Sequence, residues 1–362
     1  MAASDYLRVP KQEVLRFCHE CMTMAGASAD HGRQLAEVLT EADYRGHFSH
    51  GINRLHTYVR EIQMNTTCGD GCPEILKDTV TTAWVDGKNL LGPVVGNFCM
   101  DLAIKKAKEA GIGWVVAKGS NHYGMAGWYT LRALEHRLLG ISMTNSSPIT
   151  AITRAKSKAF GTNPISLAAP AIDGDSLVLD MATTTVSFGK VEIQNHKNEP
   201  IPLGWGQDAE GHLTTDPKDL IYREGALVPL GGPEISGGYK GTGLLIMVEI
   251  LTSVLSGGNV GPNIRRWNVN TSEEANLGQL FAAINPECFS PNFEDNLEDF
   301  LSTLRGLDPS NPDEPVLVAG DRASRHMKMV DEEGGIPYPR NLLTSLNQLA
   351  REVGVPPMEA LK

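Results

Sequence analysis

Apolar positions recur along the chain with two different periods, and each period predicts a different kind of element. In residues 11–64 and 340–352 they recur about every 3.6 residues, as in a helix with one buried face. Other helical patterns lie at 96–110, 125–136 and 240–255. Short, often β-branched runs predict strands at 79–85, 112–117, 139–144, 165–170, 176–180 and 280–285. The sequence therefore predicts a mixed α/β (α+β) fold.

One helical segment, SHGINRLHTYVREI at residues 49–62, also carries candidate chemistry. Its apolar residues form a single stripe, and Ser49 is the expected N-cap. His50 and Arg54 are four residues apart, so on a helix they project together and away from that stripe. Such a pair is either part of a solvated helix face or a site that binds an anion.

Charge and composition exclude several classes of function. The chain has 362 residues, a net charge of -11 and no block of Lys or Arg, which argues against a nucleic-acid partner. No apolar run approaches the ~18 residues of a membrane span, and the N-terminus resembles neither a signal nor a transit peptide. We therefore expect a cytoplasmic protein without membrane association. The acidic segment 286–314 is expected to form a solvated loop and helix.

Cysteine and histidine spacing gives little support for a metal site. Six cysteines in a chain of this length do not indicate a disulfide framework, and free thiols are expected. A zinc site would have to combine Cys18 and Cys21, which lie in a helical pattern, with the differently spaced pair at 68–72. The histidines of residues 47–56 do not share one helix face, and no H-E-x-x-H motif is present. No metal is predicted.

The chain lacks the G-x-G-x-x-G motif that opens the usual dinucleotide-binding fold. The nearest pattern, GIGWVVAKG at 111–119, has its glycines before the predicted strand. SNHYGMAG at 120–127 instead puts His122 at a strand-to-helix corner beside small residues. There it is either a reactive imidazole or a turn histidine bonded to nearby backbone.

Two loops place small polar residues beside predicted strands. TNSSP (144–148) contains Ser146, and GTNPIS (161–166) contains Thr162 and Asn163. Such residues either contact phosphate or ribose oxygens of a ligand or complete ordinary turns.

Two further clusters suit an anionic ligand. In LVLDMATTTVSFGK a strand is expected to end at Asp180 and a helix to start through Met181 and Ala182, so Asp180 either borders an anion site or caps the helix. The glycine-rich segment PLGGPEISGGYKGTGLL contains Lys240 and Gly241. Its glycines serve either close approach to a ligand or partner chain, or a structural hinge.

Taken together, these motifs resemble those of a known enzyme family. SHGINRLHTYVREI, SNHYGMAGWY, GTNPIS, LDMATTT, GGYKGTGLLIMVEIL and LGQLFAAINP follow one another as in the malate/L-lactate dehydrogenases that lack a Rossmann fold. That family includes malate, sulfolactate and ureidoglycolate dehydrogenases and cyclic imine reductases. The resemblance implies a non-Rossmann mixed-sheet domain at 121–289 that binds NAD or NADP. It also implies a largely helical substrate and dimerisation domain, 1–120 with 290–362, and a homodimer with active sites near the interface.

The resemblance also implies roles for individual residues. His122 matches the proton donor and acceptor, and Ser49, His50 and Arg54 fall in the substrate motif Ser-His-Gly-x-x-Arg. The residues expected around the nicotinamide cofactor are Ser146, Thr162, Asn163, Asp180, Met181, Ala182, Lys240 and Gly241. Many relatives have Gly-Glu-Arg-Glu where this chain has Gly-Asp-Arg-Ala at 320–323, which leaves the choice between NAD and NADP open.

These residues suit the reduction of a small 2-oxo acid. A guanidinium holds a carboxylate through two charged hydrogen bonds, the role expected for Arg54. Hydride transfer to a ketone needs a proton on its oxygen, which His122 is expected to supply, while His50 orients the substrate or balances a second carboxylate. Oxaloacetate/malate is the first expectation, with lactate, sulfolactate, ureidoglycolate and cyclic imines as alternatives. A non-catalytic nucleotide-binding protein would not need these three side chains.

Overall fold

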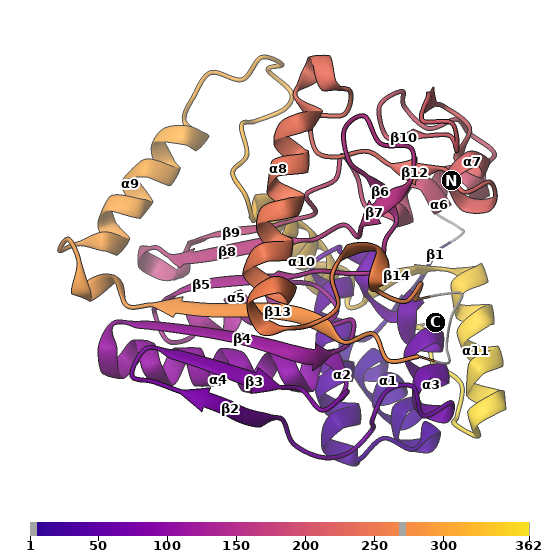
Figure 1. Cartoon of the computed structure of the whole chain (residues 1–362), viewed down its shortest axis with the longest axis horizontal. Helices are drawn as coiled ribbons and strands as arrows, with labels where there is room; N and C mark the ends of the chain where they lie inside the picture. Colours follow the sequence, from indigo (N-terminus) through magenta and orange to yellow (C-terminus); the bar gives the residue numbers. More distant parts are fainter. Residues whose placement is uncertain (1–5, 268–272, 362) are drawn as a thin grey trace.

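The computed structural model of the chain describes residues 6–267 and 273–361, and its largest element is a seven-stranded sheet (Figure 1). The strand order is β2-β3-β4-β13-β5-β8-β9; β3 and β4 are parallel, and the other neighbours are antiparallel. The strands are β2 (Glu74–Asp78), β3 (Thr82–Asp86), β4 (Ile112–Ser120), β5 (Leu139–Thr144), β8 (Ile165–Pro170), β9 (Ser176–Met181) and β13 (Leu277–Ile284). Such a sheet is not the parallel sheet of a Rossmann fold, and the predicted mixed α/β class is confirmed.

Strand β13 lies in the middle of this sheet and separates two cores. Side chains alternate between the faces of a strand, so Phe281 and Ala283 join the large core while Leu280 and Ala282 join a smaller one. Helices α4 and α5 cover the first face, and α8 with the π-helical turn that continues it covers the second. Their bounds are α4 (Gly92–Ala110), α5 (Gly127–Leu134), α8 (Gly238–Glu249) and the turn Ile250–Val254.

A five-stranded sheet forms a smaller lobe. Its order is β11-β10-β12-β6-β7, with β12 and β6 parallel. Val191, Leu220 and Leu227 contribute to a core of its own, which joins the sheet to two short helices. The elements are β6 (Thr150–Ala151), β7 (Lys158–Phe160), β10 (Gly206–Gln207), β11 (Leu213–Thr214), β12 (Ala226–Leu227), α6 (Phe188–Lys197) and α7 (Pro217–Tyr222).

The two ends of the chain form one helical region (Figure 1). Strand β1 pairs antiparallel with β14, and helices from both ends share the large core with α4. The elements are β1 (Tyr6–Val9), α1 (Lys11–Ala25), α2 (Ala29–Tyr44), α3 (Leu55–Gln63), α10 (Asp321–Glu333), β14 (Ile336–Pro339) and α11 (Arg340–Val353). The large sheet takes strands from both sides of residue 120. The domain division at 120 and 289 stays a prediction.

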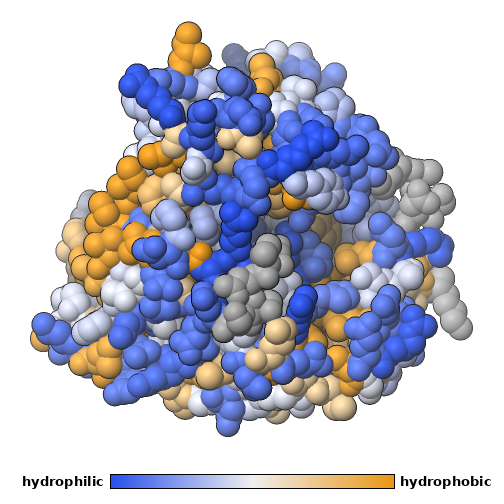
Figure 2. Space-filling view, turned by 45° about the vertical axis from the view of Figure 1, so that its right-hand side comes forward, coloured by the Kyte–Doolittle hydropathy of each residue, from blue (hydrophilic) through white to orange (hydrophobic). Residues whose placement is uncertain are grey.

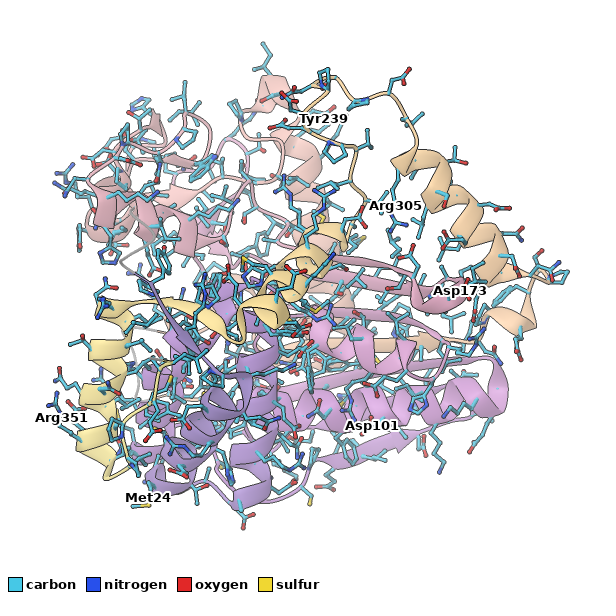
Figure 3. The ribbon with its side chains drawn as sticks, turned by 180° about the vertical axis from the view of Figure 1, so that it is seen from behind. Met24, Asp101, Asp173, Tyr239, Arg305 and Arg351 are labelled. Carbon is cyan, nitrogen blue, oxygen red and sulfur yellow. The ribbon has the colours of Figure 1, made fainter. Side chains whose placement is uncertain are left out.

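The acidic segment 286–314 contains a helix, α9 (Phe293–Arg305), as the sequence predicted. Arg305, labelled in Figure 3, forms an ion pair with Asp175 and donates from Nη2 to Asp321 Oδ1 at 2.9 Å. The segment is therefore tied to the start of β9 and to α10.

Candidate active site

The helix predicted from Ser49 is interrupted at its start. Two separate turns of 3-10 helix, Phe48–His50 and Ile52–Arg54, precede α3. The prediction of one continuous helix with Ser49 as its N-cap is therefore wrong, and Ser49 Oγ instead lies 2.9 Å from His50 Nδ1. We call residues 48–54, which contain both turns, the strap.

A buried carboxylate explains the interruption. Asp43 of α2 is 1% exposed, and its Oδ2 accepts hydrogen bonds from Ile52 N at 2.9 Å and from the Tyr338 hydroxyl at 2.7 Å. Gly51 has a non-helical ψ of -148°, and a Cβ there would lie 1.7 Å from Asp43 Oδ1. A side chain at this position would collide with the carboxylate. Burial raises the pKa of Asp43 to about 7, against the effect of its two hydrogen bonds.

His122 lies at the corner between β4 and α5, as predicted, and the fold brings His50 to it. Their rings are stacked, with centroids 5.9 Å apart. The Trp267 indole also stacks on His122, at 4.1 Å, and the Tyr58 hydroxyl lies 2.5 Å from His122 Nδ1. Because Nδ1 contacts this hydroxyl, Nε2 is the ring nitrogen left for a ligand.

Tyr58 and Trp267 also belong to this site, although no motif in the sequence predicted either of them. Tyr58 follows Arg54 by four residues, so its spacing from the Ser-His-Gly-x-x-Arg motif was a usable signal. Trp267 carried no such signal, because its position depends on a buried ion pair between Arg265 and Glu61. Glu61 Oε1 also accepts a hydrogen bond from Trp267 Nε1 at 3.1 Å, which holds the indole in place.

Arg54 reaches the site from the strap. Its Nε donates to Ser49 O at 2.9 Å, and its Nη2 donates to Glu192 Oε2 of α6 at 3.2 Å. The second contact joins the helical region to the smaller lobe, and Figure 2 shows a hollow between these two parts. Within residues 6–267 and 273–361, Nη1 has no hydrogen-bond partner. Arg54 therefore has donor capacity left for a ligand.

Burial and the Arg54 guanidinium keep both histidines uncharged at neutral pH. Burial lowers the pKa of His50 to about 3, with further contributions from Arg54 and His47. Burial also lowers the pKa of His122 well below its usual range, and His50 and Arg54 add to the effect. An anionic ligand beside Arg54 would act in the opposite direction, because a negative charge favours imidazolium. Anion binding and proton uptake are thus coupled here.

Three of the segments predicted to contact a cofactor lie beside this site. Ser146 Oγ accepts a hydrogen bond from Thr162 N at 3.2 Å, which joins the loop after β5 to the segment before β8. Thr162 O accepts from Thr183 N at 3.0 Å, which adds the segment after β9. Ser147 Oγ accepts from Trp267 N at 3.1 Å, which connects these loops to the indole on His122.

Asp180 lies inside β9 and not at the start of a helix. β9 continues to Met181, Ala182 is not helical and the next helix is α6, so the predicted helix start is wrong. Asp180 Oδ2 accepts a hydrogen bond from Gly127 N at 2.8 Å, in the first turn of α5. The carboxylate thus stabilises the N-terminus of a helix distant in sequence. Burial raises the pKa of Asp180, and His47 opposes the rise.

The other predicted cofactor residues differ in their access to a ligand. Asn163 is fully buried, and its amide donates to Glu249 Oε2 at 2.8 Å, which connects the start of β8 to α8. Gly241 is also buried, and a Cβ there would lie 2.2 Å from Leu230 O, so close backbone packing explains this glycine. Lys240 is exposed, and no carboxylate in the described part of the chain forms an ion pair with it.

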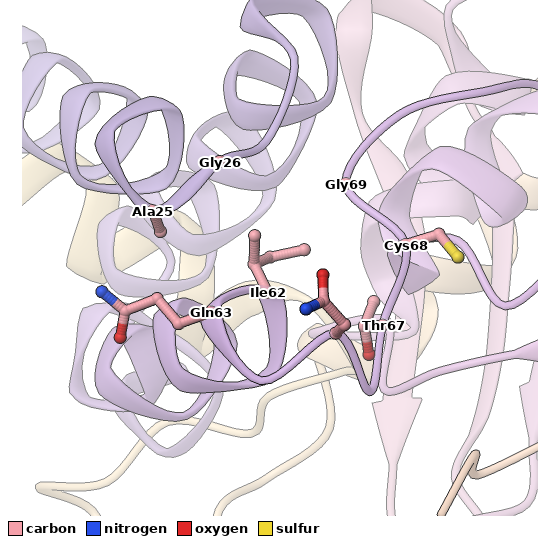
Figure 4. A pocket seen from close by; sticks show the side chains of 8 residues that line it. Ala25, Gly26, Ile62, Gln63, Thr67, Cys68 and Gly69 are labelled. Carbon is pink, nitrogen blue, oxygen red and sulfur yellow. The ribbon is translucent and has the colours of Figure 1, made fainter.

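The site is separate from the pocket shown in Figure 4. That pocket lies at the C-terminal ends of α1 and α3, and its lining includes Ala25, Gly26, Ile62, Gln63, Cys68 and Gly69. None of the predicted site residues belongs to it. Among the residues that the structure describes, no group of three or more His, Cys, Asp or Glu is arranged to hold a metal ion. In the same part of the chain, no helix is both long and apolar enough to cross a bilayer.

Comparisons with known proteins identify the family. A family model described as malate/L-lactate dehydrogenase matches residues 9–347. The chain belongs to the malate/L-lactate dehydrogenase family. Malate dehydrogenase of Pyrococcus horikoshii is 39% identical over 355 residues, which are 97% of either chain. Malate/(S)-sulfolactate dehydrogenase of Methanothermus fervidus is 35% identical over 332 residues, 91% of this chain and 93% of that one.

Solved structures of malate/L-lactate dehydrogenase family members have the same fold. The P. horikoshii malate dehydrogenase structure has a TM-score of 0.90 at 37% identity and covers 100% of this chain and 99% of its own. The Entamoeba histolytica malate dehydrogenase structure has a TM-score of 0.91 at 30% identity. The match covers 97% of this chain and 99% of that chain.

Membership of the malate/L-lactate dehydrogenase family makes this protein a hydroxy acid dehydrogenase that works with a nicotinamide cofactor. Its own residues fit such a group. Asn163 Oδ1 is buried without a hydrogen-bond partner in the described residues, close to the polar loops of Ser146 and Thr162. Lys240 adds an exposed cation near the start of α8, which suits a phosphate.

Proposed function

We propose that the protein interconverts a small 2-hydroxy acid and its 2-oxo acid with NAD or NADP, with malate and oxaloacetate as the preferred pair. The observation that supports this most directly is that His122, His50 and Arg54 lie close together in one site. Relatives named malate dehydrogenase support the substrate choice. Relatives named sulfolactate and ureidoglycolate dehydrogenase, and a piperideine-2-carboxylate reductase structure, supply the alternatives together with lactate.

In this proposal Arg54 binds the carboxylate of the substrate. Ser49 O and Glu192 occupy Nε and Nη2 along one edge of the guanidinium, so the terminal edge that contains Nη1 is left for the substrate. The paired N–H groups of that edge match the two oxygens of a carboxylate. A lysine offers no such pair of parallel donors.

His122 moves the proton. Oxidation of the hydroxy acid requires Nε2 to take the hydroxyl proton, and reduction requires Nε2 to return it to the ketone oxygen. The hydride itself is carried by the nicotinamide cofactor when it is bound. Burial raises the pKa of Tyr58 well above its usual value, so its hydroxyl stays protonated. For Nε2 to take a proton, the neutral ring must carry its own proton on Nδ1, where the Tyr58 hydroxyl accepts it; the proton of that hydroxyl can point to His122 O at 3.5 Å. The Nδ1 contact is kept when the ring becomes imidazolium, so it stabilises both states.

The other aromatic groups orient the reactants. His50, whose Nδ1 contacts Ser49 Oγ, is uncharged and offers Nε2 to the substrate. Trp267 covers one face of the His122 ring and so fixes the direction in which Nε2 points.

The cofactor is proposed to bind against Ser146, Thr162 and Asp180–Ala182, with Lys240 directed to its phosphates. The hydrogen bonds that join these loops to each other and to Trp267 support this position beside His122. Asn163 and Gly241 would shape the site through their buried contacts with α8 and the glycine-rich segment. The proposed cofactor is NAD or NADP.

The proposed assembly is a cytoplasmic homodimer. α8 and the π-helical turn that continues it cover the large sheet with one face, while Ile246 of α8 and Ile250 and Val254 of the turn are 40%, 50% and 56% exposed. Apolar side chains gather along one side of the molecule in Figure 2. A contiguous exposed apolar row of this kind is a common feature of an interface with a second copy.

An assay panel tests the proposed reaction. NADH and NADPH oxidation would be followed with oxaloacetate, pyruvate, sulfopyruvate and a cyclic imine, and NAD(P) reduction with ureidoglycolate. We expect the highest kcat/KM with oxaloacetate. A higher kcat/KM with another substrate of the panel would make that substrate, instead of oxaloacetate, the preferred one and would leave the proposed hydride transfer unchanged. Intact cofactor binding without turnover of any of them would contradict the proposal and favour a non-catalytic nucleotide-binding protein.

A further inference from the structure

Glu192 of α6 contacts the candidate site but has no part in the chemistry proposed above. Its Oε2, in the smaller lobe, accepts the hydrogen bond from Arg54 Nη2 of the helical region at 3.2 Å. One turn earlier in α6, a Cβ on Gly189 would lie 3.0 Å from Ser49 Cβ and 3.7 Å from Arg54 Nη2. α6 therefore lies directly against the strap.

Two contacts determine the orientation of the Arg54 guanidinium. The N–H of Nε and one N–H of Nη2 point along the same edge of this planar group, where Ser49 O and Glu192 accept them. A planar group held at two points along one edge cannot turn freely about its side-chain bonds. Its terminal edge then keeps one direction, which is the condition for gripping a carboxylate with two hydrogen bonds.

The contact is also partly screened from solvent. The side chains of Arg54 and Glu192 are 18% and 32% exposed, so each is partly covered by the protein. Both side chains still reach solvent, so their pair is closer to a surface pair, which contributes about 0–1 kcal/mol to folding stability, than to a buried one. Loss of the Glu192 carboxylate should therefore change substrate binding more than it changes the folded state.

We propose that Glu192 is a positioning residue that, from the smaller lobe, orients Arg54 for the substrate carboxylate. The inference rests on the proposed carboxylate-binding role of Arg54. It adds that substrate recognition depends on contact between the helical region and the smaller lobe. The strap holds Nε of the guanidinium and α6 holds Nη2, so neither part alone holds both.

Steady-state kinetics of three single variants test this role. Glu192→Ala should raise KM for the 2-oxo acid by about tenfold, the order expected for one charged hydrogen bond. The kcat and the Kd for NADH should stay close to wild type. Glu192→Gln keeps an oxygen that can accept from Nη2 and should recover most of the lost KM. Glu199→Ala removes a carboxylate from an exposed residue just after α6 and should behave as wild type.

A double-mutant cycle with Arg54 separates this inference from the proposed function. In an Arg54→Ala background, Glu192→Ala should raise KM no further, because the group that it positions is gone. An equal rise in both backgrounds, no rise in the wild-type background, or a Gln variant that behaves like Ala would each overturn the positioning role. An Arg54→Ala variant with unchanged kcat/KM would instead remove Arg54 from carboxylate binding, and with it the basis of the inference.

Discussion

At the scale of single residues, the surroundings of His122 determine what the site can do. Tyr58 contacts Nδ1 and leaves Nε2 for the substrate, while Trp267 and His50 stack on the ring. Burial and the nearby Arg54 keep the ring neutral in the free protein. A neutral imidazole with one accessible nitrogen is the form that a proton acceptor needs.

Replacement of His122 tests its role as the proton carrier. His122→Ala should lower kcat by at least about 10²-fold, the lower range for a positioned acid–base group, while NADH still binds. Stopped-flow or steady-state rates with a parallel NADH titration measure the two effects. His196→Ala, at an exposed position of α6, is the matched control. Near-normal turnover of the His122 variant would falsify the assignment.

The direction of the His122 pKa shift predicts a pH profile. In hydroxy acid oxidation the free enzyme needs neutral His122, and its pKa lies well below the usual 6.5. The kcat/KM for oxidation should therefore persist through pH 6.5 and be lost only as the pH falls further. The kcat/KM for reduction, which needs a proton on the ring, should instead fall as pH rises. An oxidation profile with its midpoint at the usual histidine pKa would contradict this environment.

At the scale of elements, the strap shows how a distant residue overrides a helical pattern. The helical spacing of apolar residues from residue 49 onward correctly predicted α3. The segment ahead of α3, however, forms two separate turns. The buried Asp43 accepts the Ile52 N–H, which replaces the hydrogen bond that a continuous helix would supply. Strands at 139–144 and 165–170, by contrast, match β5 and β8, because no such competing partner intervenes.

Gly51 is the position at which the strap is most sensitive. Gly51→Ala would bring a Cβ to 1.7 Å from Asp43 Oδ1, so either the carboxylate or the strap must move. We expect a loss of about 1–3 kcal/mol in the free energy of unfolding, as for other overpacked sites, and a higher KM. Urea denaturation and kinetics measure both.

Gly243→Ala is the control for this substitution, because a Cβ in that part of α8 meets nothing within 4 Å. It should be neutral or slightly stabilising, since alanine favours a helix over glycine. A Gly51 variant with the stability and KM of wild type would mean that the strap adjusts without cost, and would contradict the tight packing against Asp43.

At the scale of the whole molecule, three units meet around the site. The strap belongs to the helical region, His122 follows a strand of the large sheet, and Glu192 belongs to the smaller lobe. The apolar row on α8 and its π-helical turn lies on the outside of this assembly and has no cover in the described part of the chain. A second copy that covers it would form the proposed homodimer.

A charge in the apolar row tests the proposed dimer. Ile250→Lys should shift the protein towards monomer at micromolar concentration, because a charge is costly in an apolar interface. Light scattering after size-exclusion chromatography measures the mass. Val80→Lys, at a position 76% exposed between β2 and β3, should leave the mass unchanged. If the Ile250→Lys variant is still a dimer, the interface lies on another surface. If the wild-type protein is a monomer, the proposed homodimer is refuted.

The sequence by itself determined most of the long helices, the strands β3, β4, β5, β8, β9 and β13 of the large sheet and the corner position of His122, since these depend on hydrophobic period and turn chemistry between near neighbours. It did not predict β2 or the short strands of the smaller lobe. Family motifs added Arg54 and His50 as site residues, without their geometry. Only the tertiary structure decided the break at Gly51, the stacking of Trp267 and the contact between Arg54 and Glu192. Each of these depends on atoms supplied by a residue far along the chain, and no local pattern contains that information.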